Sequence, residues 1–526
     1  MKVLVSDNLG EIGIKMFQDE EEIEVDVKTG LSSEEQKNII GDYDALVIRS
    51  ATKVTEDLMD AAKNLKIIGR AGIGLDNVDI PAATKRGIIV MNTPGGNVVT
   101  TAEHTIAMML ALSRNIPLGT TSLKAGQWDK KKLQGRELFN KVLGVIGFGK
   151  IGSIVADRAH GLKMRVILHD PFVTPELIEK AGFESVSLEE LYKKSDYITV
   201  HVPKLKSTTG LINKKAFDQM KAGVMIINCA RGGIVDETDL YDAMKSNKVA
   251  GAALDVFETE PPGECKLFEL DRLICTPHLG ASTREAQTNV AIAVASQIID
   301  YLKNGTIINA VNVPSVTGEL LNRLGPFLTL ADRMGCLQAQ LCKGPVKEVV
   351  IEYAGDFFGL DLSPISIAAL KGLLAPVVKD DVNFVNAQIL AKERGIKVTE
   401  TTSSDSGHFI NLITVRIITT ELTNTVSGTI FGKNDPRIVK INNFGLELIP
   451  RGHLALIHNL DKPGAIGSIG AALGNHNINI GRMQVGQEED GERNIIFLST
   501  DTPISDAVRD ELHALPLVKA VTLLNF

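Results

Sequence analysis

The chain has 526 residues, of which 44% are hydrophobic and 23% are charged, and its formal net charge is −8 at pH 7. At about 100–200 residues per domain, this length predicts three or four domains, and the composition is that of a globular protein with sizeable cores. The modest negative charge argues against nucleic acid or an anionic membrane as a partner. A small anionic substrate would therefore have to be held by local basic residues.

The cysteines and the apolar runs indicate the compartment. The chain has 5 cysteines and none of them forms a CxxC pair, which favours reduced thiols in the cytoplasm over a disulfide framework. The start, MKVLVSDNLGEIG, has too short an apolar run for a signal peptide. The longest apolar runs, such as IAMMLAL, fall well short of the roughly 20 residues that cross a membrane.

The first half of the chain alternates short apolar strands with helical stretches. The expected strands are KVLVS, EIEVDV, ALVIRS, LKIIGR and GIIVM, and after the long helix TTAEHTIAMMLALSRN the pattern resumes with KVLGVI, RVILHD, YITVHV, VMIINC and AGAALDV. Such alternation predicts parallel sheets covered by helices. We therefore expect an α/β protein with two Rossmann-like domains.

The second half reads differently. After a helix near Ser282 to Lys303, residues 316–450 contain strands such as EVVIEYAG and FINLITVRII but no recognisable chemical motif. The last residues follow the order β-α-β-β-α-β, from HLALIHN through PGAIGSIGAALGNH to VKAVTLLNF. This order predicts a ferredoxin-like module.

The stretch GFGKIG, Gly147 to Gly152, follows strand KVLGVI and precedes a helix. In a G-x-G-x-x-G loop, the first glycine (Gly147) permits a tight turn, the second (Gly149) lets the backbone approach a pyrophosphate, and the third (Gly152) allows close packing of the helix. The next strand ends at Asp170, where an acid would bind the adenosine ribose. Pro171 follows with no arginine beside it, which favours NAD over NADP; the alternative is a plain turn with a solvated acid.

Three residues at or beyond the carboxyl ends of predicted strands are candidates for hydride-transfer chemistry: Arg231 in NCARGGIVDE, Glu260 in DVFETEPP and His278 in TPHLGAST. Open parallel sheets bind ligands at this edge. A histidine can take and return the hydroxyl proton, a carboxylate can orient the ring, and a guanidinium can grip a substrate carboxylate. Taken singly, each residue could equally be a solvated charge or loop residue. Asp255, at the end of AGAALDV, could meet the nicotinamide or merely cap its strand.

These motifs, in this order and spacing, resemble the D-2-hydroxyacid dehydrogenase family. RAGIGLDNVD at Arg70 and NTPGGNVVTTAEH at Asn92 narrow the resemblance to the branch that oxidises 3-phospho-D-glycerate to 3-phosphohydroxypyruvate with NAD, the first step of L-serine biosynthesis. The resemblance extends over the whole chain. It implies that Arg231 binds and polarises the substrate, that Glu260 pairs with the imidazole, and that His278 exchanges the proton.

The resemblance also implies the binding residues. Besides the three glycines and Asp170, those for the cofactor NAD are Ile73, Lys150, Ile151, Val202, Cys229, Ala230, Arg231, Asp255, His278, Leu279, Gly280 and Ala281. Those for the substrate are Arg49, Arg70, Asn97, Arg231 and His278. Arg49 and Arg70 follow strands and could converge on an anion, or they could be solvated strand ends. No metal is expected.

The run WDKKK, Trp128 to Lys132, places the only tryptophan beside three lysines. Such a run is usually a solvated face. In the family that it resembles, the corresponding segment lies at a dimer contact, which implies a homo-oligomer, a dimer or tetramer. The lysines are then candidates for phosphate capture at a partner's cleft.

The C-terminal module, with IHNLDKPGAIGSIG and NINIGRMQ, resembles an ACT domain, a small-molecule sensor. The resemblance implies an amino-acid effector, most plainly serine, bound by Asn459, Asp461 and Asn479. The alternative is a dimerisation module with no ligand.

The expected domains are 1–97 with 291–315 for the substrate, 98–290 for NAD, 316–450 as an intervening domain of the allosteric substrate-binding type, and 451–526 as the ACT domain. The NAD domain is thus inserted into the substrate domain, so that the two could close over a cleft. Two other functions remain open at this point. One is a dehydrogenase or reductase for a different 2-hydroxy acid, and the other is an NAD-sensing scaffold built on the same fold.

Overall fold

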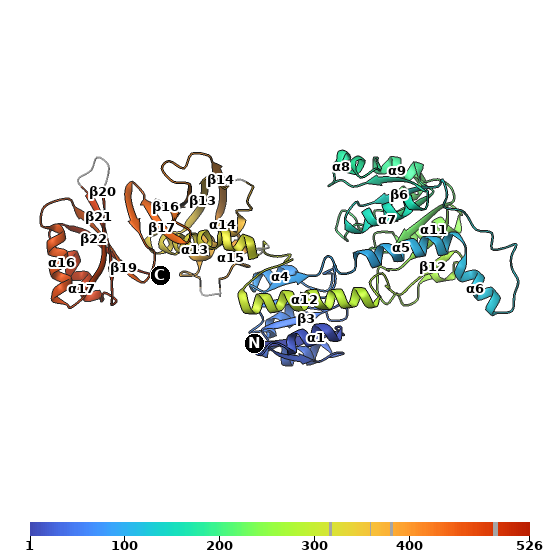
Figure 1. Ribbon diagram of the computed structural model, residues 1–526, viewed down its shortest axis with the longest axis horizontal. Coiled ribbons are helices and arrows are strands. Elements are labelled where there is room, and N and C mark those ends of the chain that lie inside the picture. Colours follow the sequence, from blue (N-terminus) through green and yellow to red (C-terminus); the bar gives the residue numbers. More distant parts are fainter. Residues whose placement is uncertain (315–317, 358, 379–381, 488–492) are drawn as a thin grey trace.

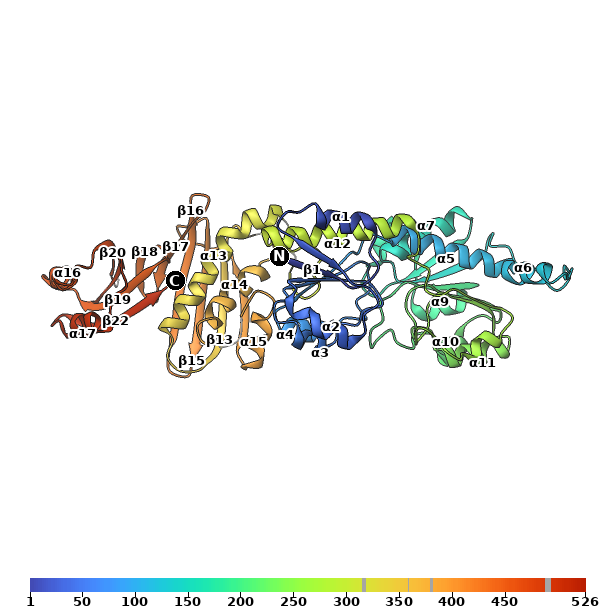
Figure 2. The same cartoon turned by 90° about the horizontal axis from the view of Figure 1, so that it is seen from below.

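The computed structural model describes residues 1–314, 318–357, 359–378, 382–487 and 493–526. Its strands form four separate sheets. The units built on these sheets follow one another along the long axis of the molecule (Figures 1 and 2): the C-terminal unit lies at one end, and the unit that contains α5 to α11 lies at the other.

The N-terminal unit is a five-stranded parallel sheet in the order β2-β1-β3-β4-β5. Its elements are β1 (Lys2–Val5), α1 (Glu11–Gln18), β2 (Glu24–Val27), α2 (Ser33–Ile39), η1 (Ile40–Asp42), β3 (Ala45–Ile48), α3 (Glu56–Ala61), β4 (Ile67–Arg70), α4 (Ile80–Lys85) and β5 (Ile89–Asn92). Apolar cores form on both faces of the sheet, as the runs of buried residues in β1 and β3 require.

Helix α12 (Arg284–Asn304) returns the chain to this N-terminal unit. Its residues Val290, Ala291 and Val294 are buried in the same core as Val3 and Val5 of β1. The approach is close, because a Cβ at Gly13 of α1 would lie 2.8 Å from the carbonyl oxygen of Ala291. The boundaries expected at 97 and 291 stay predictions, and this packing supports the second of them.

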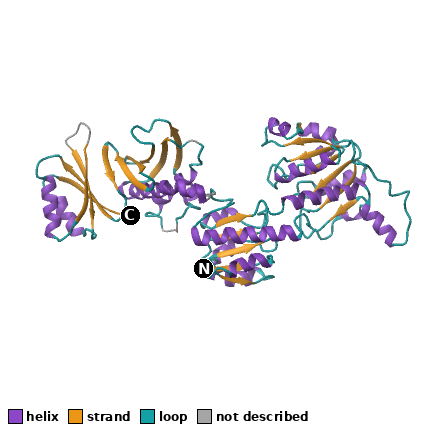
Figure 3. Cartoon of the chain, viewed as in Figure 1, coloured by secondary structure: helices purple, strands orange, loops and turns teal. Residues whose placement is uncertain are grey.

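The second unit is a seven-stranded parallel sheet in the order β12-β11-β10-β9-β6-β7-β8. Its elements are α5 (Val98–Ser113), α6 (Ile116–Lys124), β6 (Val142–Ile146), α7 (Lys150–Gly161), β7 (Arg165–His169), α8 (Pro175–Lys180), β8 (Glu184–Ser185), α9 (Leu188–Lys194), β9 (Tyr197–Val200), α10 (Lys214–Gln219), β10 (Val224–Asn228), α11 (Glu237–Lys245), β11 (Val249–Leu254), η2 (Lys266–Glu269) and β12 (Leu273–Cys275). Helices cover both faces of the sheet (Figure 3).

The third unit is a six-stranded mixed sheet in the order β14-β13-β15-β16-β17-β18. Its elements are α13 (Gly318–Leu341), β13 (Val346–Gly355), α14 (Ser363–Leu374), α15 (Ala387–Glu393), β14 (Lys397–Ser403), β15 (Asn411–Thr419), β16 (Thr423–Phe431), β17 (Asp435–Ile441) and β18 (Phe444–Leu448). Residues of α13 and α14 pack against alternate residues of the strands, for example Leu330 and Leu370 with Ile413 and Val415.

The C-terminal unit is a four-stranded antiparallel sheet in the order β20-β21-β19-β22. Its elements are β19 (His453–Leu460), α16 (Ala465–Asn475), β20 (Ile480–Gln487), β21 (Arg493–Thr500), α17 (Asp506–Ala514) and β22 (Val518–Asn525), which is the predicted β-α-β-β-α-β order. Residues of one face, such as Ala455 and Ile457, pack against the two helices. Leu454 and Leu456, on the other face, join the core of the third unit.

The expectation of α/β units with parallel sheets, followed by two α+β units, is therefore confirmed. Within the described residues, no helix is long and apolar enough to cross a membrane.

Candidate active site

The glycine loop between β6 and α7 has the geometry that its sequence predicts. Gly147 has φ +97°, and a Cβ there would lie 2.5 Å from the carbonyl oxygen of His201. A Cβ at Gly152 would lie 2.0 Å from the carbonyl oxygen of Gly147. A Cβ at Gly149 would meet nothing within 4 Å, and Gly149 is the N-cap of α7 with no side chain to satisfy the helix amides. Gly149 therefore leaves open the place where the α7 amides can receive an anion.

Asp170 lies at the mouth of this loop, directly after β7. Its Oδ2 accepts from the Phe148 N–H at 2.7 Å, and its Oδ1 accepts from the Phe172 N–H at 2.8 Å. Each carboxylate oxygen keeps a further lone pair, so both could still accept from ribose hydroxyls. These residues fit an NAD molecule with its pyrophosphate on α7.

Other expected cofactor residues lie around the same edge of the sheet. Val202 follows β9 and lies against Gly147. Cys229 follows β10, and burial raises the pKa of its thiol to about 12. The thiol is therefore uncharged at neutral pH and can line the site only as a neutral side chain. Ile73 lies in the N-terminal unit, in the loop after β4, where its carbonyl accepts from Asn92 Nδ2 at 2.7 Å.

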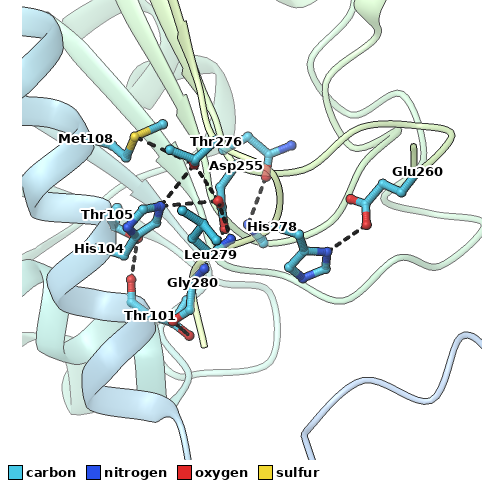
Figure 4. A network of polar contacts seen from close by, with 12 residues as sticks. Thr101, His104, Thr105, Met108, Asp255, Glu260, Thr276, His278, Leu279 and Gly280 are labelled. Atoms are coloured by element: carbon cyan, nitrogen blue, oxygen red, sulfur yellow. Dashed lines mark hydrogen bonds and ion pairs between the residues drawn. The ribbon is translucent and has the colours of Figure 1, made fainter. Parts of the chain in front are cut away.

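His278 and Glu260 are in direct contact (Figure 4). The distance from His278 Nδ1 to Glu260 Oε2 is 2.7 Å, and the two side chains are 45% and 37% exposed. Burial opposes ionisation of Glu260, but hydrogen bonds from His278 and from the Phe257 N–H outweigh it and hold the pKa of that carboxyl below its ordinary value. Since Nδ1 faces the carboxylate, Nε2 is the nitrogen left to exchange a proton with a substrate.

Arg231 follows β10 and reaches across to the N-terminal unit. Its Nε donates to Asp76 Oδ2 at 3.0 Å, and one of its terminal nitrogens donates to the Ala230 carbonyl at 2.7 Å. A Cβ at Gly74 would lie 1.8 Å from the other terminal nitrogen. The loop 74–76 therefore holds this guanidinium in one orientation. Sequence reasoning missed Asp76, although it lies inside the quoted stretch RAGIGLDNVD.

Asp255 is the centre of a polar network behind His278. Its side chain is 1% exposed, and its oxygens accept from the backbone N–H groups of Leu279 and Gly280 at 2.7 and 2.8 Å. The hydroxyl of Thr276 and Nε2 of His104 also contact it. These contacts match the strand-end cap that was one of the two expectations for this residue. His104 and Thr276 were missed, although the polar residues at 101, 104 and 105 share one face of their helix, which is a visible signal.

The arginines expected to bind substrate lie near one another at the carboxyl edge of the N-terminal sheet. Burial and, next, the neighbouring guanidinium of Arg231 lower the pKa of Arg70 to about 10, which leaves it protonated at neutral pH. Arg49 contributes to the same crowding of positive charge. Asn97 stands at the N-cap position of α5 without a side-chain cap, and its buried Oδ1 has no hydrogen-bond partner among the described residues. An anion among these residues would relieve the repulsion between the guanidinium groups.

The expected effector residues are not brought together within one chain. Asn459 is 2% exposed on β19, and its register partner on β21 is Asn494, which sequence reasoning missed. The Oδ1 atoms of both asparagines are buried and accept no hydrogen bond from the part of the chain that the structure describes. Exposed Asp461 lies just beyond β19, but Asn479 precedes β20, whose first residue pairs with Thr500 at the other end of β21. Six residues of strand, about 20 Å, separate the two ends.

The comparisons with known proteins match this division of the chain. Residues 106–280 match the model for the NAD-binding domain of D-isomer specific 2-hydroxyacid dehydrogenases. Residues 323–442 match the D-3-phosphoglycerate dehydrogenase intervening domain, and residues 453–517 match the ACT domain. The second unit is thus the NAD-binding domain of a D-isomer specific 2-hydroxyacid dehydrogenase, the class that its glycine loop and the His278–Glu260 pair indicate.

Relatives and a solved structure narrow the class. The chain is 43% identical to D-3-phosphoglycerate dehydrogenase of Bacillus subtilis over 100% of its own length and 99% of that protein. It is 44% identical to the protein of the same name from Archaeoglobus fulgidus over 98% of each. A crystal structure of D-lactate dehydrogenase from Aquifex aeolicus with NAD and lactic acid matches with a TM-score of 0.53 and 29% identity, over 60% of this chain and 100% of that one. The chain belongs to the D-3-phosphoglycerate dehydrogenase family.

Proposed function

We propose that the chain oxidises 3-phospho-D-glycerate to 3-phosphohydroxypyruvate with NAD, which is the first step of L-serine biosynthesis. The observation that carries the proposal is the 2.7 Å contact between His278 and Glu260 at the sheet edge that also holds the glycine loop and Arg231. The full-length identity to relatives named for this activity supports the choice of substrate.

His278 is the general base of the proposed oxidation. Its Nε2 takes the proton of the substrate hydroxyl and returns it in the reverse reaction. Glu260, bound to Nδ1 at 2.7 Å, holds the ring orientation and stabilises the imidazolium that forms. When bound, NAD supplies the acceptor for the hydride that leaves the same carbon.

Arg231 is the proposed carboxylate ligand. Asp76 and the Ala230 carbonyl together fix its guanidinium plane, so the donors that remain can bind the substrate carboxylate and polarise the developing carbonyl. Arg49, Arg70 and Asn97 are the proposed ligands for the rest of the anion. The crowding of Arg70 with the other two arginines supports this role.

The test is NADH formation from NAD and each of three acids: 3-phosphoglycerate, glycerate and D-lactate. We expect turnover of the phosphorylated acid and roughly 100-fold or more lower kcat/KM for the other two, because without the phosphate they leave half-buried cationic donors unpaired. Comparable rates with lactate would instead identify a dehydrogenase for a different 2-hydroxy acid. Absence of turnover with all three, combined with intact NADH binding, would favour an NAD-sensing scaffold.

We propose further that the ACT domain binds serine between two copies of the chain. Asn459 and Asp461 would come from one copy and Asn479 from the other, since one chain holds them at opposite ends of its sheet. The two buried, unpartnered amide oxygens of Asn459 and Asn494 support a ligand with N–H donors. Serine should alter the rate of the wild-type enzyme and leave Asn459→Leu unaffected; equal responses would refute the site.

A homo-oligomer in the cytoplasm completes the proposal. Helix α6 projects from the NAD-binding domain (Figure 1), and the residues Ile116, Leu123 and Trp128 on and after it are 54, 60 and 81% exposed. Apolar surface of this extent supports contact with a second copy. All 5 cysteines are free thiols, which supports a reducing compartment.

A further inference from the structure

His104 lies on α5 against the polar network behind the proposed active site, at the face of the helix that meets the sheet (Figure 4). Its Nε2 is 3.2 Å from Asp255 Oδ1 and 3.1 Å from Thr276 Oγ1. The side chain is only 20% exposed. Nothing in the proposed mechanism so far uses this histidine.

The direction of the hydrogen bonds follows from the chemistry of the acceptor. Burial opposes ionisation of Asp255, but hydrogen bonds from His104, Thr276 and the two backbone amides outweigh it and hold the pKa of that carboxyl below its ordinary value. An ionised carboxylate only accepts. Thr276 donates its one hydroxyl proton to Asp255, so it accepts from His104. The proton on His104 is therefore on Nε2, shared between Asp255 and Thr276.

Asp255 in turn fixes the loop that carries His278. Its carboxylate accepts from the N–H groups of Leu279 and Gly280, and its own carbonyl accepts from the His278 N–H at 2.9 Å. The loop needs this support because His278 has φ +54°, a left-handed conformation that a residue with a side chain adopts at a cost. If Asp255 turned, the imidazole would move with the loop.

The same helix holds the loop at a second point. One turn before His104, Thr101 Oγ1 lies 3.0 Å from the Gly280 carbonyl and 3.0 Å from the Asn97 carbonyl, so its one proton is shared between the two. The helix begins just after Asn97, where the chain crosses from the N-terminal unit, so α5 joins the crossing to the active-site loop. Two contacts from one rigid helix fix both the position and the rotation of the loop.

We propose that His104 is a positioning residue of the reaction, which fixes Asp255 and thereby the loop 276–281 and the imidazole of His278. This inference rests on the proposed dehydrogenase function. It also has a consequence that does not depend on turnover, because the amides of Leu279 and Gly280 should be protected from exchange only while Asp255 is held.

The test compares His104→Leu, which removes the donor at similar volume, with His104→Gln, whose Nε2 can replace it. Loss of one hydrogen bond to a buried charge should lower kcat about tenfold in the leucine variant and change the two KM values much less. The glutamine variant should stay within about threefold of wild type. Glu103→Gln, an exposed neighbour on the same helix that pairs with Arg158, is the control and should match the wild type.

Hydrogen exchange of a peptide covering residues 276–281 gives the second readout. We expect the Leu279 and Gly280 amides to exchange about tenfold faster in His104→Leu, with exchange in the N-terminal sheet unchanged. Thr276→Val removes the hydroxyl that bridges His104 and Asp255 at constant volume. It replaces the leucine variant in this experiment if that variant does not fold. It should have the same effect on the loop, and the double variant should be no worse than the worse single one.

Wild-type exchange of this peptide in both His104→Leu and Thr276→Val would overturn the inference. So would faster exchange throughout the NAD-binding domain with no rescue by glutamine, which would make His104 merely structural. Absence of turnover in the wild-type protein would overturn the proposed function alone, because the exchange measurement would still decide the role of His104.

Discussion

The two α/β units share one architecture but end their central strands differently. Both sheets are parallel, and both reverse their strand order at a switch point: between β1 and β3 in the N-terminal unit, and between β6 and β9 in the NAD-binding unit. Open parallel sheets bind ligands at such points. In the NAD-binding unit, Gly147 permits the tight turn and Gly149 leaves the point open for a large anion.

In the N-terminal unit the chain fills the same point with its own carboxylate. Asp7, buried just after β1, accepts from the Arg49 N–H at 2.6 Å and from the N–H and hydroxyl of Thr52 at 3.1 and 2.8 Å. Asp7 thereby fixes the backbone of Arg49, whose guanidinium donates to the Asn8 carbonyl at 3.2 Å. The switch point of the NAD-binding unit is thus lined by glycines, whereas that of the N-terminal unit holds an aspartate that fixes the backbone of Arg49.

The largest effect should come from removing the proton-transfer group in the NAD-binding unit. His278→Ala should lower kcat by about 1000-fold, because general acid–base catalysis contributes roughly 100- to 10,000-fold. NADH fluorescence titration should show almost unchanged cofactor affinity, since the glycine loop is untouched. A variant that keeps more than a tenth of wild-type activity would contradict the assignment.

The open switch point can be closed by one methyl group. In Gly149→Ala, the new Cβ points into free space at a φ of −76° that alanine tolerates, so folding should be unaffected. The methyl group would stand where the pyrophosphate approaches, and we expect KM for NAD to rise about 100-fold, as for a loss of roughly 3 kcal/mol of binding.

Gly152→Ala is the matched control for that variant. Its Cβ would lie 2.0 Å from the Gly147 carbonyl oxygen, so it should lower the thermal unfolding midpoint as well as cofactor affinity. If Gly149→Ala bound NADH as tightly as the wild type, the position of the pyrophosphate would be wrong.

The filled switch point can be opened by Asp7→Asn. The new amide places an N–H₂ group against the N–H donors of Arg49 and Thr52. Because these buried donors would lose their acceptor, the free energy of unfolding should fall by about 2 kcal/mol. Release of the Arg49 backbone should also raise KM for 3-phosphoglycerate several-fold and leave KM for NAD unchanged. Urea unfolding measures the first effect, and steady-state kinetics measure the second. An increase in KM for NAD instead would contradict the proposal that the N-terminal unit binds the substrate and the other unit binds NAD.

The smallest effect concerns the projecting segment. Changing Lys130, Lys131 and Lys132 to alanine should raise KM for 3-phosphoglycerate about two- to fivefold at low salt and less at high salt, because exposed charges act weakly and are screened. Lys214→Ala with Lys215→Ala, on α10, is the control for a change of net charge. Equal KM values for the lysine-run variant and the wild type would contradict the hypothesis that these lysines help to bind the substrate phosphate.

Much of the fold was readable because its signals are local. The alternation of short strands and helices, the glycine spacing of GFGKIG and the β-α-β-β-α-β order each depend on neighbouring residues. His278 and Glu260 could be paired in advance because both follow strands that end at one edge of a parallel sheet, and the contact is there at 2.7 Å. Asp76 and His104 could not be found this way, since their partners lie on other units or on distant strands.

The sequence by itself determined the types of unit, their order and the chemistry that each can supply, because hydrophobic period and turn chemistry are set within a few residues. Only the tertiary structure decided which groups act on one another. Packing between two units brought Asp76 to Arg231, and packing of α5 against its sheet brought His104 to Asp255. Antiparallel register placed Asn459 and Asn479 at opposite ends of their sheet. These outcomes depend on long-range packing, in which a residue's neighbours are set by the whole core rather than by its own segment.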